Sequence, residues 1–259
     1  SLDCTFNKNK NLKGRLDELR SEAEVAVREG GKHLVLTDKK IGEEKIAIPM
    51  ALAIGAINSR LVDVGIRGFA SINVETSEAF DTHSFAVLLG VGATTINPYL
   101  AMDSIRQRYE KNLFNKLSFE DCIKRYIKSV DNGLLKIMSK MGISILSAYR
   151  GGCNFEAVGL SRSIVAEYFP GMISRISGIG IAGIEKKLKK LHAKGFEKNV
   201  SILPIGGIYK YRKNGETHQY QGRLIHMLQS AVTNNSYAIY KKYTQNVYDL
   251  PIVNLRDIL

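Results

Sequence analysis

The chain has 259 residues, of which 44% are hydrophobic and 24% are charged, a balance typical of a globular protein with one large domain or two modest ones. Its apolar runs are too short to span a membrane, and its start lacks the basic and apolar pattern of a signal peptide. Three widely spaced cysteines exclude a disulfide framework and favour a reducing, cytoplasmic location.

The net charge of +12 raises nucleic acid as a partner. The densest lysine cluster lies at residues 185–198, where Ile184, Leu188 and Leu191 recur at helical spacing. Because the lysines then occupy the solvated face of an amphipathic helix, we expect neither a nucleic-acid partner nor a membrane partner.

Residues 1–150 alternate between helix and strand signals. Helices are predicted where apolar residues recur every three or four positions, and strands where short apolar runs are bounded by turn residues. In chain order the sequence predicts a helix over 12–30, a strand over 32–38, a helix over 49–64, a strand over 68–76, a helix over 81–93, a strand over 94–100 and a helix over 101–114.

The best-specified element is a helix over 118–142. Ser118 suits the N-cap, Glu120 and Asp121 suit the positive end of the helix dipole, and Gly142 can close the helix. Asp-Asn-Gly at 131–133 interrupts the helix without changing its apolar phase, so we expect at most a small kink. A strand over 143–147 follows.

Beyond residue 151 the signals weaken and are mostly helical. Helical segments are predicted at 155–159, 163–169, 183–195, 221–233 and 236–249, and a strand-like segment at 201–212. The repeated strand-then-helix order predicts an α/β fold with a mostly parallel sheet and flanking helices, and a degenerate or incomplete (β/α) barrel-like arrangement also fits. We assign 1–259 to a single domain, with a subdivision near 150 as an alternative: βα units over 1–150 and a mostly helical region over 151–259.

A glycine-rich corner is the candidate anion site. Arg150, Gly151 and Gly152 lie between a predicted strand and a predicted helix, where consecutive N–H groups can bind phosphate and an Arg adds a bidentate donor. The corner lacks both the phosphate-loop pattern and the dinucleotide spacing, and residues 178–184 match the latter without a convincing preceding strand. We therefore favour a tight corner over an anion nest.

Five polar residues follow predicted strands, where α/β folds place catalytic groups. They are Asp38, Glu75, Glu78, Asp81 and Asn97. Their spacing assigns no catalytic role, so loop or helix-cap duty is the preferred interpretation and no catalytic residue is predicted.

The five histidines show no metal-ligand spacing, and no nucleophile motif is present. They are His33, His83, His192, His218 and His226. We expect each to be a surface or hydrogen-bonded structural histidine, and we predict no metal site.

Several long blocks, in order, resemble the large subunit of glutamate synthase. At 133–161 the chain reads GLLKIMSKMGISILSAYRGGCNFEAVGLS, and at 65–101 it reads GIRGFASINVETSEAFDTHSFAVLLGVGATTINPYLA. The blocks IPMALAIGAI (48–57), YFPGMISRISGIG (168–180) and LPIGGIYKYRKNGETHQYQ (203–221) extend the similarity over nearly the whole chain. They resemble the central domain, between the glutamine amidotransferase and FMN-binding domains.

The resemblance implies a parent enzyme that makes glutamate from glutamine and 2-oxoglutarate. The parent would use FMN and an iron–sulfur cluster, with electrons from NADPH, NADH or ferredoxin. None of the family's catalytic or cofactor residues carries over: Cys4 is not in the nucleophile's context, and the three cysteines are too far apart for a cluster. The implied role is a noncatalytic scaffold that links the neighbouring domains and helps to form the ammonia tunnel. The implied partners are those domains and the electron-donating small subunit.

Two other hypotheses stay open: an autonomous α/β enzyme that binds FMN or a phosphate ligand at 150–152, and a basic nucleic-acid-binding module. On the scaffold hypothesis, the chain alone is expected to be inactive. Its start at Ser1 without Met predicts a segment of a longer protein, with an apolar surface patch where neighbouring domains pack.

Overall fold

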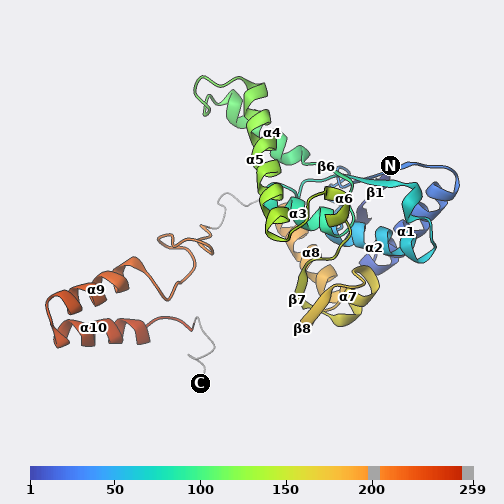
Figure 1. Cartoon of the computed structure of the whole chain (residues 1–259). Helices are drawn as coiled ribbons and strands as arrows, with labels where there is room; N and C mark the ends of the chain where they lie inside the picture. The colour runs from blue at the N-terminus through green and yellow to red at the C-terminus, as the bar shows by residue number, and fades with distance from the viewer. Residues whose placement is uncertain (198–204, 253–259) are drawn as a thin grey trace. The chain divides into compact units, whose positions relative to one another are not determined.

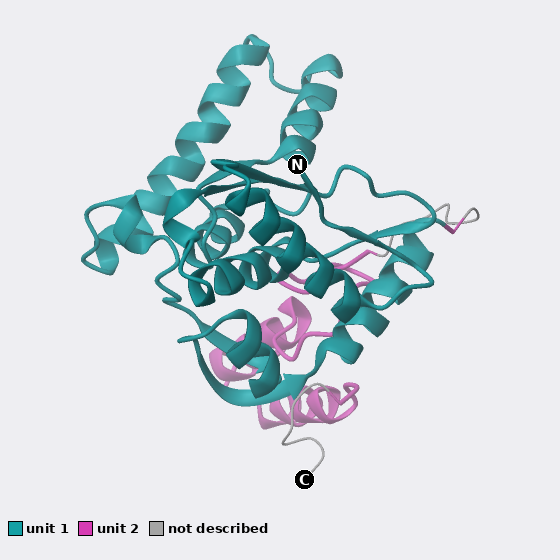
Figure 2. Cartoon of the chain, turned by 90° about the vertical axis from the view of Figure 1, so that its right-hand side faces the viewer, with its two compact units in different colours: residues 1–196 teal, residues 197–259 magenta. Residues whose placement is uncertain are grey.

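The computed structural model describes residues 1–197 and 205–252. The chain divides into two compact units, 1–196 and 197–259 (Figure 2). The strands are β1 (Leu2–Asp3), β2 (Thr5–Asn7), β3 (His33–Thr37), β4 (Lys45–Ala47), β5 (Ser71–Glu75), β6 (Thr95–Asn97), β7 (Glu156–Leu160) and β8 (Ile173–Ile179). The helices are α1 (Leu12–Arg28), α2 (Met50–Asp63), α3 (Thr82–Gly90), α4 (Tyr99–Glu110), α5 (Phe119–Lys140), α6 (Leu146–Tyr149), α7 (Arg162–Tyr168), α8 (Ile181–Gly195), α9 (Gly222–Thr233) and α10 (Tyr237–Tyr248), with a short 3-10 helix at Arg67–Phe69.

The main sheet of the first unit has the strand order β1-β3-β5-β6, and every neighbouring pair is parallel. Helices α3 and α4 directly follow β5 and β6, and α2 follows β3 after the short strand β4, as the sequence predicts for an α/β fold. The predicted fold class is therefore confirmed. The sheet is open, and the described residues form no closed barrel. A two-stranded antiparallel sheet, β2-β4, and a two-stranded parallel sheet, β7-β8, complete the unit.

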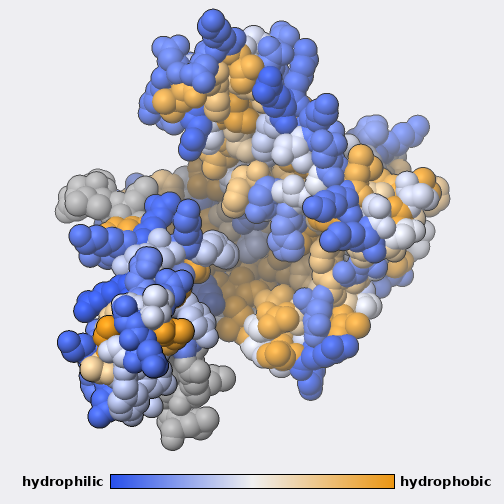
Figure 3. Space-filling model, turned by 60° about the vertical axis from the view of Figure 1, so that its left-hand side comes forward, coloured by the Kyte–Doolittle hydropathy of each residue, from blue (hydrophilic) through white to orange (hydrophobic). Residues whose placement is uncertain are grey.

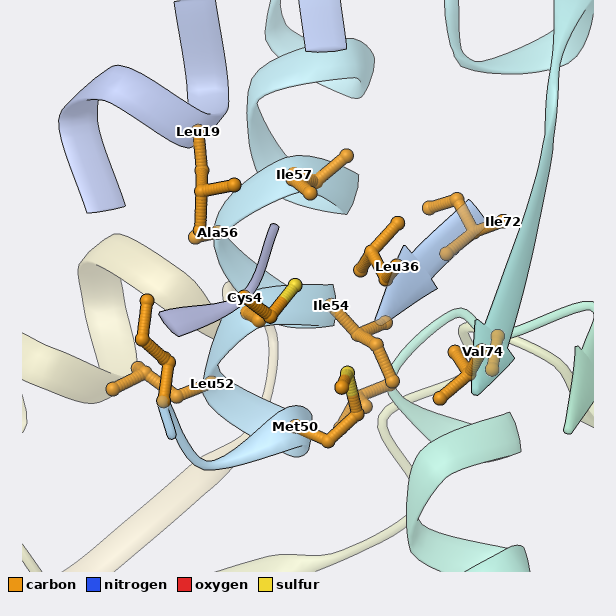
Figure 4. Packing of buried hydrophobic residues seen from close by; sticks show 14 of the residues in the cluster. Cys4, Leu19, Leu36, Met50, Leu52, Ile54, Ala56, Ile57, Ile72 and Val74 are labelled. Carbon is orange, nitrogen blue, oxygen red and sulfur yellow. The ribbon is translucent and has the colours of Figure 1, made fainter. Parts of the chain in front are cut away.

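Helix α2 supplies the centre of the hydrophobic core. Figure 4 shows Met50 and Ile54 of this helix next to Leu36, Ile72 and Val74, which β3 and β5 contribute. The alternating burial along β5 explains this contact, since only one side of a pleated strand faces the helix. Figure 1 shows α4 and α5 extending side by side away from the sheet.

Helix α8 is anchored to the start of α1 by one carboxylate. Glu185 accepts a hydrogen bond from the Leu12 backbone N–H at 2.8 Å and one from Lys189 Nζ at 2.7 Å. The Leu12 N–H is one of the free donors at a helix N-terminus, so the carboxylate caps α1 from another helix. The hydrogen bonds from Lys189 and from Leu12 lower the pKa of Glu185.

The structure corrects several predicted elements. Residues 143–145 have no regular secondary structure and 146–147 begin α6, where a strand was predicted. Residues 156–160 form β7, where a helical segment was predicted. Strands β1, β2, β4 and β8 were missed. Residues 205–212 form no strand, and the rest of that prediction, 201–204, lies outside the described residues.

The remaining helices agree with the sequence. Helix α5 runs through Asp131–Gly133 without a break, and Ser118 caps it by accepting from the Asp121 backbone N–H at 3.1 Å. The predicted helices 221–233 and 236–249 correspond to α9 and α10, which pack against each other in the second unit. No helix of the described residues is long and apolar enough to cross a membrane.

Candidate functional site

The carboxyl edge of the parallel sheet gathers polar residues from three strands. Asp38, just after β3, is only 1% exposed. Its Oδ2 accepts hydrogen bonds from Thr76 Oγ1 at 2.6 Å and from the Ser77 backbone N–H at 2.9 Å. Its Oδ1 accepts from Tyr99 Oη at 2.7 Å. Both oxygens of this buried carboxylate are therefore satisfied by protein donors, as a buried charge requires.

Tyr99 remains a hydrogen-bond donor over the physiological pH range. Burial and the Asp38 carboxylate raise the pKa of Tyr99 to about 12. The Lys39 ammonium also lies 5.2 Å from the centre of the Tyr99 ring, within the range of a cation–π contact. The ring thus joins the buried carboxylate to a surface charge.

Glu75, the last residue of β5, lies on the solvent side of this cluster. It accepts hydrogen bonds from Lys39 Nζ at 2.7 Å and Thr37 Oγ1 at 2.9 Å, with Asn97 Nδ2 at 3.4 Å. The bond from Lys39 lowers the pKa of Glu75, since it favours the charged form. Glu75 is therefore an ion-paired carboxylate that ties β3, β5 and β6 together.

The other two predicted carboxylates hold helix ends. Glu78 accepts the Met50 backbone N–H at 2.7 Å, at the start of α2, where Pro49 offers no side-chain cap. Desolvation by neighbouring protein atoms raises the pKa of Glu78, although the residue is exposed in part. Asp81 caps α3 by accepting the Ser84 backbone N–H at 2.8 Å. Both residues have a structural partner at the N-terminus of a helix, where a carboxylate is favourable.

The corner at Arg150–Gly152 is bonded to backbone carbonyls. The N–H of Gly151 donates to Leu89 O at 3.1 Å, that of Gly152 to Tyr149 O at 3.1 Å, and that of Arg150 to Leu146 O at 2.9 Å. The adjacent Cys153 N–H donates to Gly90 O at 3.3 Å. The corner thus covers the carbonyls at the C-terminal end of α3, the negative end of its dipole.

An anion at this corner would have to displace these hydrogen bonds and approach the negative end of a helix. The corner also connects α6 to β7, helix to strand, which reverses the strand-to-helix order that the sequence predicts. Gly151 has φ +69° and Cys153 has φ +48°, so two residues in the left-handed region make the turn tight.

The cysteines do not fit an iron–sulfur cluster. Cys4 and Cys122 are buried on separate elements, and Cys153 is half-buried in the corner. Burial raises the pKa of Cys4 to about 12, which disfavours the thiolate that a metal needs. Within residues 1–197 and 205–252, no group of three or more His, Cys, Asp or Glu side chains is arranged to hold a metal ion.

Three of the histidines have a hydrogen-bonding partner in the protein, and a fourth lines a cavity. His33 Nδ1 lies 2.7 Å from Ser71 Oγ, and His192 Nε2 lies 3.1 Å from Glu43 O. His218 is hydrogen-bonded to the backbone carbonyl of Gly207. His83 lies on the rim of a cavity of about 320 Å³ whose other walls are mostly apolar, between α2, α3 and β7.

The edge cluster consists of Asp38, Glu75, Thr76, Ser77, Asn97 and Tyr99, and the sequence pointed to three of these six residues. Asp38, Glu75 and Asn97 were predicted from their positions after strands. Thr76, Ser77 and Tyr99 were not, although Thr76 and Ser77 directly follow β5 and Tyr99 follows β6 by two residues. Polar residues immediately after a parallel strand are the signal that would have found them.

Comparison with known proteins agrees with this architecture. Residues 1–161 match the family model described as glutamate synthase central domain. The glutamate synthase [NADPH] large chain of Azospirillum brasilense is 50% identical over 261 residues, which cover 100% of this chain and 17% of that protein. The corresponding large chain of Bacillus subtilis is 37% identical over 258 residues, covering 99% and 17%. The ferredoxin-dependent glutamate synthase of Spinacia oleracea is 36% identical over 260 residues, covering 96% and 16%.

The chain therefore spans only about 17% of the length of the relatives it matches, while nearly all of its own length is similar to them. The match of 1–161 covers the whole parallel sheet, the edge cluster and the corner at 150–152. On this combination of family match, co-linear similarity and fold, the chain belongs to the glutamate synthase central domain family.

Proposed function

We propose that this chain acts as a noncatalytic scaffold within a glutamate synthase large chain. There it links a glutamine amidotransferase domain to an FMN-binding domain and helps to form the ammonia tunnel between them. The observation that carries the proposal is the internal use of the polar edge. Asp38, Glu75, Glu78 and Asp81 each accept hydrogen bonds from neighbouring strands, loops or helix ends.

The complete protein would make glutamate from glutamine and 2-oxoglutarate. Its relatives are named for NADPH, ferredoxin and, in Schizosaccharomyces pombe, NADH. We propose one of these as the electron donor, with FMN and an iron–sulfur cluster held outside these 259 residues. The partners are then the other domains of the large chain and an electron-donating small subunit, in the cytoplasm.

The test uses the complete large chain with Glu75→Gln. A scaffold role predicts glutamine hydrolysis and glutamate formation within about twofold of the unsubstituted protein, because no transition-state contact is lost. A loss of about a hundredfold or more in either rate at unchanged thermal stability would assign Glu75 a catalytic role and overturn the proposal.

The linking role has its own readout, the ammonia released into solution during turnover. With Asp38→Ala, heating unfolds unit 1 at a lower temperature than in the unsubstituted protein. Between the unfolding temperature of the variant and that of the unsubstituted protein, we expect glutamine hydrolysis to continue, glutamate formation to fall and free ammonia to appear. An unchanged ratio of glutamate formed to glutamine consumed would contradict the linking role.

A further inference from the structure

The sheet formed by β7 and β8 has an exposed face and an unpaired edge. Its two strands are parallel, and parallel sheets in proteins are almost always covered on both faces. Helices α7 and α8 contact the sheet, and Ala157 of β7 is buried. The pairing places Val158 beside Ile176 and Glu156 beside Ile173. Val158, Ile173 and Ile176 are 66%, 54% and 62% exposed.

The outer edge of β8 is also open. Among the described residues, the backbone of 173–178 pairs only with β7. An exposed strand edge presents a row of free N–H and C=O groups that another extended segment can use. Exposed apolar side chains and a free edge together are the features of strand addition, in which the backbone provides affinity and alternate side chains provide specificity.

An apolar groove continues from this sheet. The cavity of about 320 Å³ is lined by Val158 and Leu160 of β7, Phe155 and Met172 beside the sheet, and Val87 of α3. Figure 3 shows that apolar residues gather in patches among the charged ones on the visible face of the molecule. Large contiguous apolar patches on a protein surface mark interaction sites.

The place of the sheet in the sequence indicates what covers it. The family match ends at residue 161, directly after β7, whereas similarity to the relatives continues through β8. The sheet therefore joins the matched domain to the following part of a protein about six times as long, judged from the 17% share. A polypeptide segment of that same protein lies at high effective concentration, so it is favoured over a separate partner.

We propose that an extended segment of the large chain, outside these 259 residues, adds to the free edge of β8 and packs its apolar side chains beside Ile173 and Ile176. The segment carries apolar side chains at alternate positions, as the exposed isoleucines require. This inference rests on the proposed function, because it takes the rest of the large chain as the occupant.

The test is hydrogen exchange of peptides that cover 173–179, in the 259-residue chain and in the complete large chain that contains it. We expect the β8 amides to exchange at least about tenfold more slowly in the complete chain, because strand addition protects the outer N–H groups. Equal exchange rates would overturn the proposal. Protection in the 259-residue chain that rises with its concentration would also overturn it, in favour of a second copy.

Two variants of the complete chain separate docking from general stability. Ile176→Asp is expected to remove the added protection of β8, while Val25→Asp, at a position 52% exposed on α1, is expected to keep it. The same loss in both variants would contradict the proposal. Glutamate formation by the same samples distinguishes the two proposals. If the complete chain is active and its β8 is unprotected, strand addition is refuted and the proposed function stands. If the complete chain is inactive and its β8 is protected, the result counts against the proposed function and strand addition stands.

Discussion

Replacing Asp38 by Ala tests whether the polar edge holds the fold. The change removes an acceptor from four donors, Thr76 Oγ1, the Ser77 N–H, Ser77 Oγ and Tyr99 Oη. Each hydrogen bond to a charged group contributes about 1.5–3 kcal/mol, but Ser77 and Tyr99 are partly exposed, so water can replace the carboxylate as their acceptor. The buried Thr76 hydroxyl has no such access. We therefore expect a loss of about 2–4 kcal/mol in the free energy of unfolding.

The assay is urea and thermal unfolding followed by far- and near-ultraviolet circular dichroism. For a unit of this size, a loss of about 3 kcal/mol lowers Tm by about 6–12 °C. Asp63→Ala, at the exposed end of α2, is the matched control and should change stability by less than about 0.5 kcal/mol. The double variant with Tyr99→Phe should lose less than the sum of the single losses, because the two residues share one hydrogen bond. If Asp38→Ala behaves like Asp63→Ala, the cluster does not stabilise the fold.

Three further predictions concern other parts of the first unit. Gly178→Ala should lower the free energy of unfolding by about 1–3 kcal/mol, since its Cβ would lie 2.1 Å from the carbonyl oxygen of Gly159. Gly195→Ala is the control, because its Cβ meets nothing within 4 Å, and equal melting temperatures of the two variants would refute the prediction. Glu185→Gln should lower the free energy of unfolding by about 1 kcal/mol at pH 7, because a neutral acceptor replaces a charged one for the Leu12 N–H and for Lys189. Because the pKa of Glu185 is lowered in the folded chain, its contribution is present above the unfolded value of 4.5 and is lost as pH falls through the folded value. The difference in stability between the variant and the parent should therefore shrink as the pH falls below 4.5, and a constant difference would exclude this linkage. Cys4, buried with a pKa of about 12, should resist alkylation at pH 8 until the chain unfolds, and rapid labelling of Cys4 in the folded chain would contradict its burial.

The strongly patterned elements of the fold could be predicted from the sequence. The helix over 118–142 had a cap, dipole-matched charges and a regular apolar repeat, and α5 follows it closely. The strands β3 and β5 were apolar runs that the sheet buries. These signals are local, so no knowledge of the tertiary structure was needed to detect them.

The errors occur where distant contacts decide the local structure. Residues 143–147 alternate like a strand, but the chain turns there, and the nearby Tyr149 hydroxyl donates to Ala86 O of α3. Residues 155–159 contain helix-forming types, yet Gly159 has φ +77° and lies against Gly178 of β8. Neither contact can be read from the segment that it controls.

The positions of some of the candidate site residues could be predicted from the sequence, but their roles could not, because their partners are distant in the chain. The positions of Asp38 and Glu75 after strands follow from the α/β pattern. Their roles depend on partners such as Tyr99, 61 residues further along the chain from Asp38. The glycine-rich corner lies between α6 and β7 and not between a strand and a helix, and only the structure shows that its N–H groups donate to the carbonyls of Leu146, Leu89 and Tyr149.

The most direct test of the central claim, that these residues carry no cofactor site of their own, is an FMN titration of the purified chain, with its visible absorbance spectrum recorded first. We expect a colourless protein and no saturable binding of FMN or inorganic phosphate, because the N–H groups of Arg150–Gly152 already donate to carbonyls. A yellow protein, or saturable binding that Arg150→Ala weakens, would contradict it and would make the corner a phosphate site.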